Sequence, residues 1–428
     1  MKRVVFIILD GLGDRPIADL GYKTPLQTAF KPNIDKLASK GIVGLVHPIS
    51  PGVPPGSDSA HLAYFGYDPT TENPGRGSLE ALGYGIKIGY DTIAFRVNFA
   101  TLSGDVIIDR RAGRIESEYA SQLAEEVNQE IKSINGFNFK LINTLDHRGI
   151  LLVSGSNVSR EVTDTDPHTI GVPPLRCKPL EAASSPENAI RTANAVNRYL
   201  RRVRGVLCKS EVNKHRMEEG KPPANVILIR GAGVKPSLES FHDRWGFKAA
   251  CIAGGPLYKG VAAALGMDVI NVPGATGRVD SNFSSKFKHA TRIIKEYDFV
   301  FIHIKATDIA SHDRKPLLKV ELIEKIDHEM EILSNLSSED VLIVLTGDHS
   351  TSCITGMHTG DPVPILFHGG VRIDEVKSFD EVSAIAGGLG FIRGLNIMPL
   401  VLNAADRAEE FGIKTSSKPR MYRMHYDR

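Results

Sequence analysis

The chain has 428 residues, of which 52 are Lys or Arg and 50 are Asp or Glu. A chain of this length can bury a large core and can form two or three lobes. The net charge of +2 gives no electrostatic reason to expect a nucleic-acid or membrane partner, while a compact anionic ligand stays compatible with it.

The cysteines and the N-terminus bear on location. The four cysteines are widely spaced and form no CxxC pair, which argues against a disulfide framework and a cysteine zinc site and favours the cytoplasm. The N-terminal apolar run of six residues ends at Asp10. It is too short for a signal peptide or a membrane span, so it predicts a first strand.

Short continuous apolar runs alternate with helical patterns along much of the chain, which is typical of parallel strands covered on both faces. The clearest runs lie at 4–9, 299–304 and 341–346, and two clear helical patterns lie at 32–41 and 317–333. Together they predict a doubly wound α/β core.

The middle of the chain has a different pattern. Residues 94–115 and 137–155 predict hairpins around a helix at 117–131, and a long helix follows from the N-cap Ser185, with Pro186 in its first turn. The basic stretch 209–224 is interpreted as a connector. The predicted domains are a first core segment at 1–88, an inserted α+β domain at 89–224 and a second core segment at 225–428. The basic tail at 414–428 is interpreted as a solvated end.

Metal-competent residues follow the three clearest strands. In open α/β sheets ligands collect at the carboxyl ends of the strands, so these side chains can converge although they lie far apart in sequence. Another such residue precedes a further apolar run at 364–368. The candidate ligands are Asp10, Asp308, His312, Asp348, His349 and His358.

Six oxygen and imidazole ligands suit Mn2+, Zn2+ or Mg2+, and they are too many for one catalytic ion that keeps open positions. We therefore expect two divalent ions, about 4 Å apart, an arrangement suited to phosphoryl displacement. Ser57 in "PPGSDSAH", held in a stiff turn, is the candidate nucleophile, because a metal ligand would lower the pKa of its hydroxyl. Ser59 is the competing hydroxyl.

Each of these candidate ligands and hydroxyls alone has an ordinary structural explanation, such as a helix N-cap for an Asp at a strand end or a turn for the Ser-Asp-Ser sequence. Their joint occurrence in this order favours a metal site. The segments "VVFIILDGLGD", "GSDSAH", "KATDIASHD", "TGDHS" and "MHTGDPVP" resemble metal-site motifs of the alkaline phosphatase superfamily, specifically its cofactor-independent phosphoglycerate mutases. "DRRAGR" and "DTDPH", together with "TPLQTAFKPNIDKLASKG", "PGRGSLEALGYGI" and "AFRVNFATL", resemble the archaeal-type branch.

This resemblance implies a two-metal phosphomutase of glycolysis and gluconeogenesis that interconverts 3-phosphoglycerate and 2-phosphoglycerate without bisphosphoglycerate. It implies that Ser57 is transiently phosphorylated. One ion would be held by Asp308, His312 and His358. The other would take Asp10, Ser57, Asp348 and His349.

A mutase must retain glycerate and exclude water while the phosphoserine exists, so the insert is predicted to bind substrate and to act as a lid. Arginine forks bind carboxylates and phosphates, and both groups are present on the substrate. For any one arginine, a solvated surface position is the competing interpretation. The predicted substrate-binding residues are Arg111, Arg114, His147, Arg148, Asp166, Arg230 and Lys259, with Arg110 and His168 beside them in "DRRAGR" and "DTDPH".

The glycine-rich stretches at 75–85 and 386–394 match neither a Walker loop nor a strand-bound GxGxxG motif, which excludes ATP and NAD as predicted cofactors. Gly75, Gly77 and Gly83 are expected to make turns. The rival functions are a phosphopentomutase, a phosphatase or a homoserine-kinase-like relative. A catalytically silent metal-binding scaffold is a rival from another class. The native metal and the oligomeric state are left open.

Overall fold

The computed structural model describes residues 1–336 and 338–410, so the predicted solvated tail at 414–428 lies outside the described residues. The chain divides into two compact units. One comprises Met1–Asn73 with Leu238–Arg428 and is called the core unit; the other comprises Pro74–Ser237 and is called the insert unit.

The boundaries predicted at 88/89 and 224/225 differ from this division. Helix α4 (Arg76–Gly83) packs on strands β3 (Thr92–Ser103) and β8 (Val226–Val234), and β8 pairs antiparallel with β3. Both elements therefore belong to the insert unit. Sequence patterns could not show this, because β8 has the same continuous apolar character as a core strand.

The glycines of 75–85 were predicted as turns, and two of them are helical instead. Gly75, with φ of +103°, is the N-cap of α4, whereas Gly77 and Gly83 lie inside it. A Cβ at Gly77 would come within 2.2 Å of the Ala94 carbonyl oxygen. The absent side chain lets α4 approach β3 closely.

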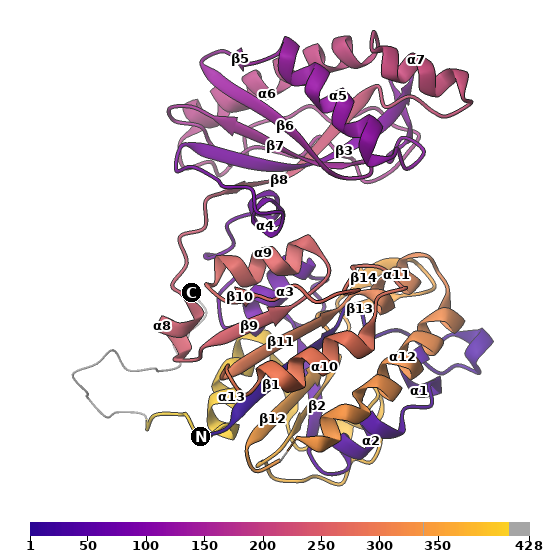
Figure 1. Cartoon of the computed structure of the whole chain (residues 1–428), viewed down its shortest axis with the longest axis vertical. Helices are drawn as coiled ribbons and strands as arrows, with labels where there is room; N and C mark the ends of the chain where they lie inside the picture. Colours follow the sequence, from indigo (N-terminus) through magenta and orange to yellow (C-terminus); the bar gives the residue numbers. More distant parts are fainter. Residues whose placement is uncertain (337, 411–428) are drawn as a thin grey trace. The chain divides into compact units, whose positions relative to one another are not determined.

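The sheet of the core unit has eight strands in the order β10-β9-β11-β1-β12-β15-β2-β16 (Figure 1). Strand β15 runs antiparallel to both neighbours, and the other neighbouring pairs are parallel. The predicted doubly wound core is confirmed. The strands are β1 (Arg3–Leu9), β2 (Ile42–His47), β9 (Ala249–Ile252), β10 (Asp268–Val269), β11 (Phe299–Ile304), β12 (Val341–Thr346), β15 (Val363–His368) and β16 (Gly390–Arg393).

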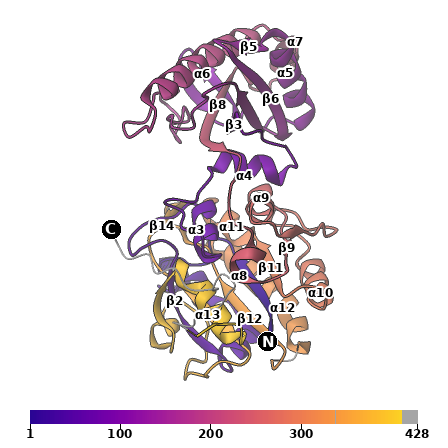
Figure 2. The same ribbon diagram turned by 90° about the vertical axis from the view of Figure 1, so that its left-hand side faces the viewer.

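Helices cover both faces of this sheet. Helices α2, α10 and α12 lie on one face and α3, α9 and α13 on the other (Figures 1 and 2). No helix in the described part of the chain is long and apolar enough to cross a membrane. The α-helices of the unit are α1 (Pro25–Thr28), α2 (Pro32–Ala38), α3 (Ser57–Tyr64), α8 (Phe241–Trp245), α9 (Pro256–Ala264), α10 (Phe283–Ile293), α11 (Ala306–His312), α12 (Pro316–Met330) and α13 (Ile397–Ala404).

Strand register determines which residues meet at the carboxyl edge of the sheet. Leu9 of β1 is paired with Ile304 of β11, and Ile8 is paired with Thr346 of β12. Because the three strands are parallel, the residues that follow them emerge at nearly the same level. Strand β2 runs in the same direction, since β15 is antiparallel to both β12 and β2.

The insert unit is built on an antiparallel sheet that agrees with the predicted hairpins. Its strands follow the order β4-β3-β7-β6-β5, with β8 on β3. Helices α5 and α6 cover one face and α4 lies against the other (Figure 1). The remaining elements are β4 (Val106–Asp109), β5 (Ser133–Ile134), β6 (Phe137–Leu145), β7 (Arg148–Ser154), α5 (Ser117–Glu130), α6 (Pro186–Leu207) and α7 (Glu211–Glu218).

Two features of the insert unit bear on its predicted helices. Ser185 is the N-cap of α6 by position, but its side chain makes no capping bond. The stretch interpreted as a connector contains α7, whose N-cap Ser210 accepts a hydrogen bond from the Val212 amide. Arg216 of α7 is buried and donates to Glu116, so the helix is tied to the unit by a charge pair that composition did not reveal.

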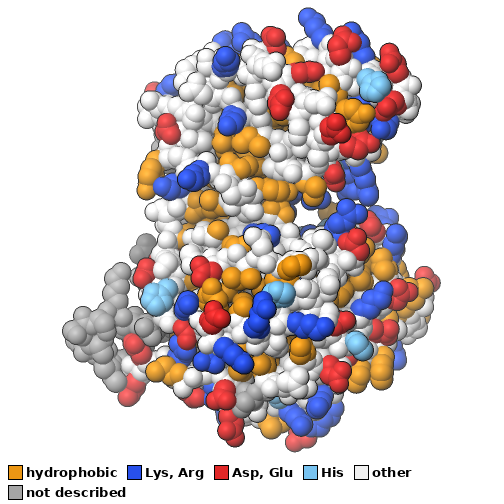
Figure 3. Space-filling model, in the orientation of Figure 1, with side chains coloured by type: hydrophobic (Ala, Val, Ile, Leu, Met, Phe, Trp, Pro, Cys, Tyr) orange, Lys and Arg blue, Asp and Glu red, His pale blue; other side chains and the backbone are white. Residues whose placement is uncertain are grey.

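Charged side chains of both signs are interspersed on the face of each unit seen in Figure 3. One pair lies instead inside the core unit. Lys319 of α12 and Asp14 are both fully buried, with Nζ 3.0 Å from Oδ2. The same Nζ donates to the carbonyl oxygens of Gly13 and Thr351. The ammonium thus joins the loop after β1 to the strand β13 (Ser350–Ser352).

We expect Lys319→Met to lower the free energy of unfolding by roughly 3–5 kcal/mol, because Asp14 would be left as an unpaired buried charge. Urea denaturation of the full chain measures this. Adding Asp14→Asn to the variant should recover part of the loss, since the uncompensated charge disappears. A loss below about 1 kcal/mol in the single variant would contradict the pairing.

Candidate active site

The first predicted ligand set is assembled at the carboxyl edge of the core sheet. Asp308 and His312 lie one turn apart on α11, with Oδ1 of Asp308 3.3 Å from Nε2 of His312. His358, on strand β14 (Met357–Thr359), places its Nε2 3.8 Å from the same carboxylate oxygen and 3.2 Å from Nε2 of His312. Three donor atoms therefore converge as predicted.

The second predicted set also converges. Nε2 of His349 lies 3.4 Å from Oδ1 of Asp10, 3.3 Å from Oδ2 of Asp348 and 3.2 Å from Oγ of Ser57. All four side chains are buried. The parallel directions of β1, β2 and β12 explain the meeting, because each residue follows the carboxyl end of its strand.

The two sets are adjacent through His349 and His358. Their rings stack with centroids 3.7 Å apart. Donor atoms of Asp308, His349 and His358 lie within 4.8 Å of one another, as do those of Asp10, Asp348 and His349. His349 belongs to both groups, so the donors form one continuous cluster in the core unit.

Unpaired oxygens in this cluster fit divalent ions. Oδ1 of Asp10 and Oδ2 of Asp348 are buried and have no hydrogen-bond partner among the described residues. Uncompensated buried oxygens are costly, and a cation next to His349 Nε2 would satisfy both. Carboxylate and imidazole donors also suit Mn2+, Zn2+ or Mg2+.

Ser57 was expected in a stiff turn, and it is instead the first residue of α3, after the N-cap Gly56. Its position at the positive end of the helix favours an oxyanion on Oγ. Ser59 has a different environment, because its Oγ accepts a hydrogen bond from Asn73. Of the two hydroxyls, that of Ser57 contacts the ligand cluster.

Burial and charge set the protonation of the cluster. Burial alone would raise the pKa of Asp10, but Lys305 and His303 outweigh it and hold this pKa well below its usual value. Burial and the charge of Asp10 raise the pKa of Asp348 well above its usual value. Burial, followed by the nearby His358, lowers the pKa of His349 to about 3, which leaves its imidazole neutral, the form that binds metals.

Several residues of the cluster were not predicted from the sequence. Nζ of Lys305 lies 2.9 Å from Asp10 and 2.7 Å from Asp308. Tyr258 and His303 both hydrogen-bond Oδ2 of Asp10, and their rings stack at 3.4 Å. The signal for Lys305 was present, since it follows β11 as Asp10 follows β1. No local pattern marked Tyr258.

Thr351 also escaped prediction, and it bridges the two ligand sets. Its hydroxyl donates to Oδ1 of Asp308 over 3.0 Å and lies 2.9 Å from Nδ1 of His349. A carboxylate can only accept, so the hydroxyl proton points to Asp308 and Nδ1–H of His349 donates to the hydroxyl. This fixes the tautomer that leaves Nε2 open to a metal.

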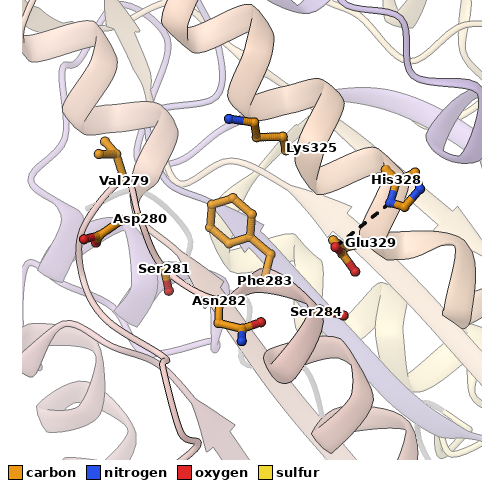
Figure 4. A pocket seen from close by; sticks show the side chains of 9 residues that line it. All are labelled: Val279, Asp280, Ser281, Asn282, Phe283, Ser284, Lys325, His328 and Glu329. Carbon is orange, nitrogen blue, oxygen red and sulfur yellow. Dashed lines mark ion pairs between the residues drawn. The ribbon is translucent and has the colours of Figure 1, made fainter.

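Lys259 is the predicted substrate residue in the core unit. Its Nζ donates to Asn271 over 3.1 Å, while its neighbour Tyr258 contacts Asp10. A separate pocket of about 360 Å3 opens between residues 279–284 and α12, with Phe283 at its centre (Figure 4). None of its lining residues is a predicted site residue.

Two of the predicted residues of the insert unit, Arg148 and Arg230, form a basic cluster with Arg96. Arg96 and Arg230 are directly opposite on β3 and β8, and Nη1 of Arg96 pairs with Glu80 at 3.0 Å. Burial lowers the pKa of Arg96 to about 9, although Glu80 opposes this. Arg148 adds to the positive charge around Arg96, and its Nε is buried without a hydrogen-bond partner among the described residues.

The other predicted residues border this cluster or lie at the surface. Asp166 accepts two bonds from Arg110 and lies 3.8 Å from Arg230, whose Nη1 is 3.3 Å from His168. Burial, followed by the charge of Arg148, lowers the pKa of His147 to about 3. Arg111 and Arg114 are exposed on the turn after β4.

Comparisons with known proteins agree with this chemistry. The sequence pattern described as 2,3-bisphosphoglycerate-independent phosphoglycerate mutase matches residues 38–213. A protein of that name from Pyrococcus horikoshii is 47% identical over 414 residues, 96% of this chain and 99% of the relative. One from Thermococcus kodakarensis is 45% identical over the same shares. The chain belongs to the family of 2,3-bisphosphoglycerate-independent phosphoglycerate mutases.

Solved structures agree with this family membership. A Pyrococcus horikoshii protein structure has a TM-score of 0.82 and 41% identity, covering 96% of this chain and 99% of that one. The cofactor-independent phosphoglycerate mutase from Thermoplasma acidophilum has a TM-score of 0.66 and 40% identity, with coverage of 95% and 100%. The predicted family and fold class are confirmed.

We expect Thr351→Val to weaken Mn2+ binding about 10- to 100-fold, because Asp308 and the His349 tautomer lose their common hydrogen-bond partner. Isothermal titration of the metal-free protein measures the affinity. Thr359→Val is the matched control, since the Thr359 hydroxyl donates to Asp361, which is not a candidate ligand. Equal affinities in both variants would contradict the role of Thr351.

Proposed function

We propose that this chain interconverts 3-phosphoglycerate and 2-phosphoglycerate through a phosphoserine at Ser57, with two divalent ions and without bisphosphoglycerate. Membership of the family supports the reaction. The proposal depends most on the position of the Ser57 hydroxyl, 3.2 Å from His349 Nε2. The same nitrogen lies 3.4 Å from Oδ1 of Asp10 and 3.3 Å from Oδ2 of Asp348, the two carboxylate oxygens that have no hydrogen-bond partner among the described residues.

The two ions would be held as the resemblance implies. One ion would be held by Asp308, His312 and His358. The other would be held by Asp10, Asp348 and His349, together with Ser57. When bound, the ions supply Lewis-acid polarisation of the phosphoryl oxygens and lower the pKa of the serine hydroxyl.

The chain's own groups account for the remaining steps. Oγ of Ser57 forms a bond to phosphorus as the bond from phosphorus to the substrate oxygen breaks. The serine hydroxyl loses one proton and the freed glycerate oxygen takes up one to become a hydroxyl, so the step has no net change in protons. The start of α3 stabilises negative charge on Oγ. The other glycerate hydroxyl then reverses these changes, taking the phosphoryl group and restoring the serine.

We also propose that the basic cluster of the insert unit binds the carboxylate or phosphate of the substrate. Arg96 and Arg148 each have a buried Nε without a partner among the described residues, which is the expected state of donors that wait for an anion. Six further residues stay predicted contacts of the substrate: Arg111, Arg114, His147, Asp166, Arg230 and Lys259. The lid role, the cytoplasmic location and the absence of nucleic-acid or membrane partners stay predictions.

We expect Ser57→Ala to lower kcat for phosphoglycerate isomerisation by on the order of 10⁴-fold or more, because the covalent step is lost. The assay contains Mn2+ and no bisphosphoglycerate, and phosphorus NMR separates the two isomers. Mass spectrometry of the wild-type chain should detect phosphate on the peptide that contains Ser57.

Ser59→Ala is the matched control and should keep most of the activity. Loss of activity in Ser59→Ala but not in Ser57→Ala would show that the nucleophile is misassigned. Release of inorganic phosphate without isomerisation by the wild-type chain would replace the mutase proposal with a phosphatase.

We expect Arg148→Lys to raise KM for phosphoglycerate about tenfold, because a lysine keeps the charge but cannot form the two-pronged bond. Steady-state kinetics at fixed Mn2+ measures the change. Arg198→Lys serves as control, since the Arg198 guanidinium donates to Asn135 at the surface. An unchanged KM in Arg148→Lys would exclude Arg148 from substrate binding.

A further inference from the structure

The register of strands β1 and β11 places Lys305 next to Asp10 in the metal centre. Ile304 is paired with Leu9, so Lys305 and Asp10 are the first residues beyond two adjacent parallel strands. Asp308 follows three residues later on α11, and its carboxylate turns back to the same ammonium. The lysine therefore stands between a carboxylate of each ligand set.

The two carboxylates use different oxygens for Lys305 and for the imidazoles. Nζ contacts Oδ2 of Asp10 and Oδ2 of Asp308. Oδ1 of Asp10 faces His349, and Oδ1 of Asp308 faces His312. Because the oxygens next to the imidazoles are not taken by the ammonium, Lys305 can stay in place while both ligand sets bind ions.

Charge balance gives this position a role. Asp10, Asp308 and Asp348 are buried and close together. Among the described residues, Lys305 is the only lysine or arginine within ion-pair distance of any of them. Buried like charges repel strongly, and an unpaired buried carboxylate is costly. The metal-free protein thus depends on one ammonium where the metal-loaded protein has three cations.

We propose that Lys305 is the resident counter-charge of the metal centre, a positioning residue that holds Asp10 and Asp308 together before the ions arrive. The inference rests on the two-ion centre of the proposed function. The lysine stabilises the metal-free fold, and it repels each arriving divalent ion. It thereby stabilises the vacant centre and limits how tightly the ions are held.

The test compares wild type and Lys305→Met, without substrate, by thermal melting and by titration with Mn2+. We expect the metal-free variant to melt on the order of 5–10 °C below metal-free wild type. Saturating Mn2+ should close most of this gap, because the ions replace the lost charge. By linkage, Mn2+ should bind the variant at least about tenfold more tightly.

Two further variants distinguish the contribution of the positive charge of Lys305 from that of its hydrogen bonds. Lys305→Arg, which preserves the cation and can contact both carboxylates, should restore most of the metal-free stability. Lys305→Gln, which can hydrogen-bond but is neutral, should behave like Lys305→Met. Lys31→Met is the control for a buried lysine that contacts no candidate ligand, since Lys31 pairs with Asp35, and Mn2+ should leave the difference in stability between this variant and wild type unchanged.

A metal-free Lys305→Met chain that melts like wild type would overturn the proposal. So would a gap that Mn2+ does not reduce, or Mn2+ binding that is unchanged or weaker, because Lys305 would then be an ordinary structural residue. If Lys305→Met folds in neither state, the same criteria apply to Lys305→Gln. The melting and Mn2+-binding measurements do not depend on isomerisation by the wild-type chain. Failure of the proposed function would be seen separately, in the isomerisation assay.

Discussion

Buried negative charge is the constraint on which the site depends. The carboxylates of Asp10, Asp308 and Asp348 are withdrawn from water at the edge of a sheet whose strands are continuously apolar. Such buried carboxylates repel one another when ionised, so all three can be ionised together only with cations among them. Lys305 supplies one of these, and the orphaned oxygens beside His349 indicate where the others fit. In the proposed function, the stability of the fold and the catalytic chemistry therefore depend on the same set of charges.

The sheet explains why these charges meet at all. Parallel pairing of β1 with β11 and with β12 brings Asp10, Lys305 and Asp308 to one level, and β2 delivers the chain that reaches Ser57. Ser57, the nucleophile of the proposed function, lies at the first residue of α3 and thus at the positive end of a helix. Ser57 was expected in a stiff turn, and the start of a helix presents it instead.

Sequence patterns predicted the strands of the core and the convergence of the candidate ligands after them, because a continuous apolar run followed by Asp is a local signal. They missed what depends on distant contacts. The pairing of β8 with β3 moved a domain boundary, and the charge pair of Arg216 with Glu116 is part of a helix interpreted as a connector. Thr351 and Tyr258 have ordinary local surroundings, so only folding reveals their contacts with Asp308 and Asp10.

In the proposed function, side chains from separate strands hold two divalent ions beside Ser57. Crystals of the full chain grown with Mn2+, measured at the manganese absorption edge, test this most directly. We expect two anomalous peaks about 4 Å apart, one within bonding distance of Asp308, His312 and His358 and the other within bonding distance of Asp10, Asp348 and His349. A single peak, or peaks bound by other residues, would contradict it.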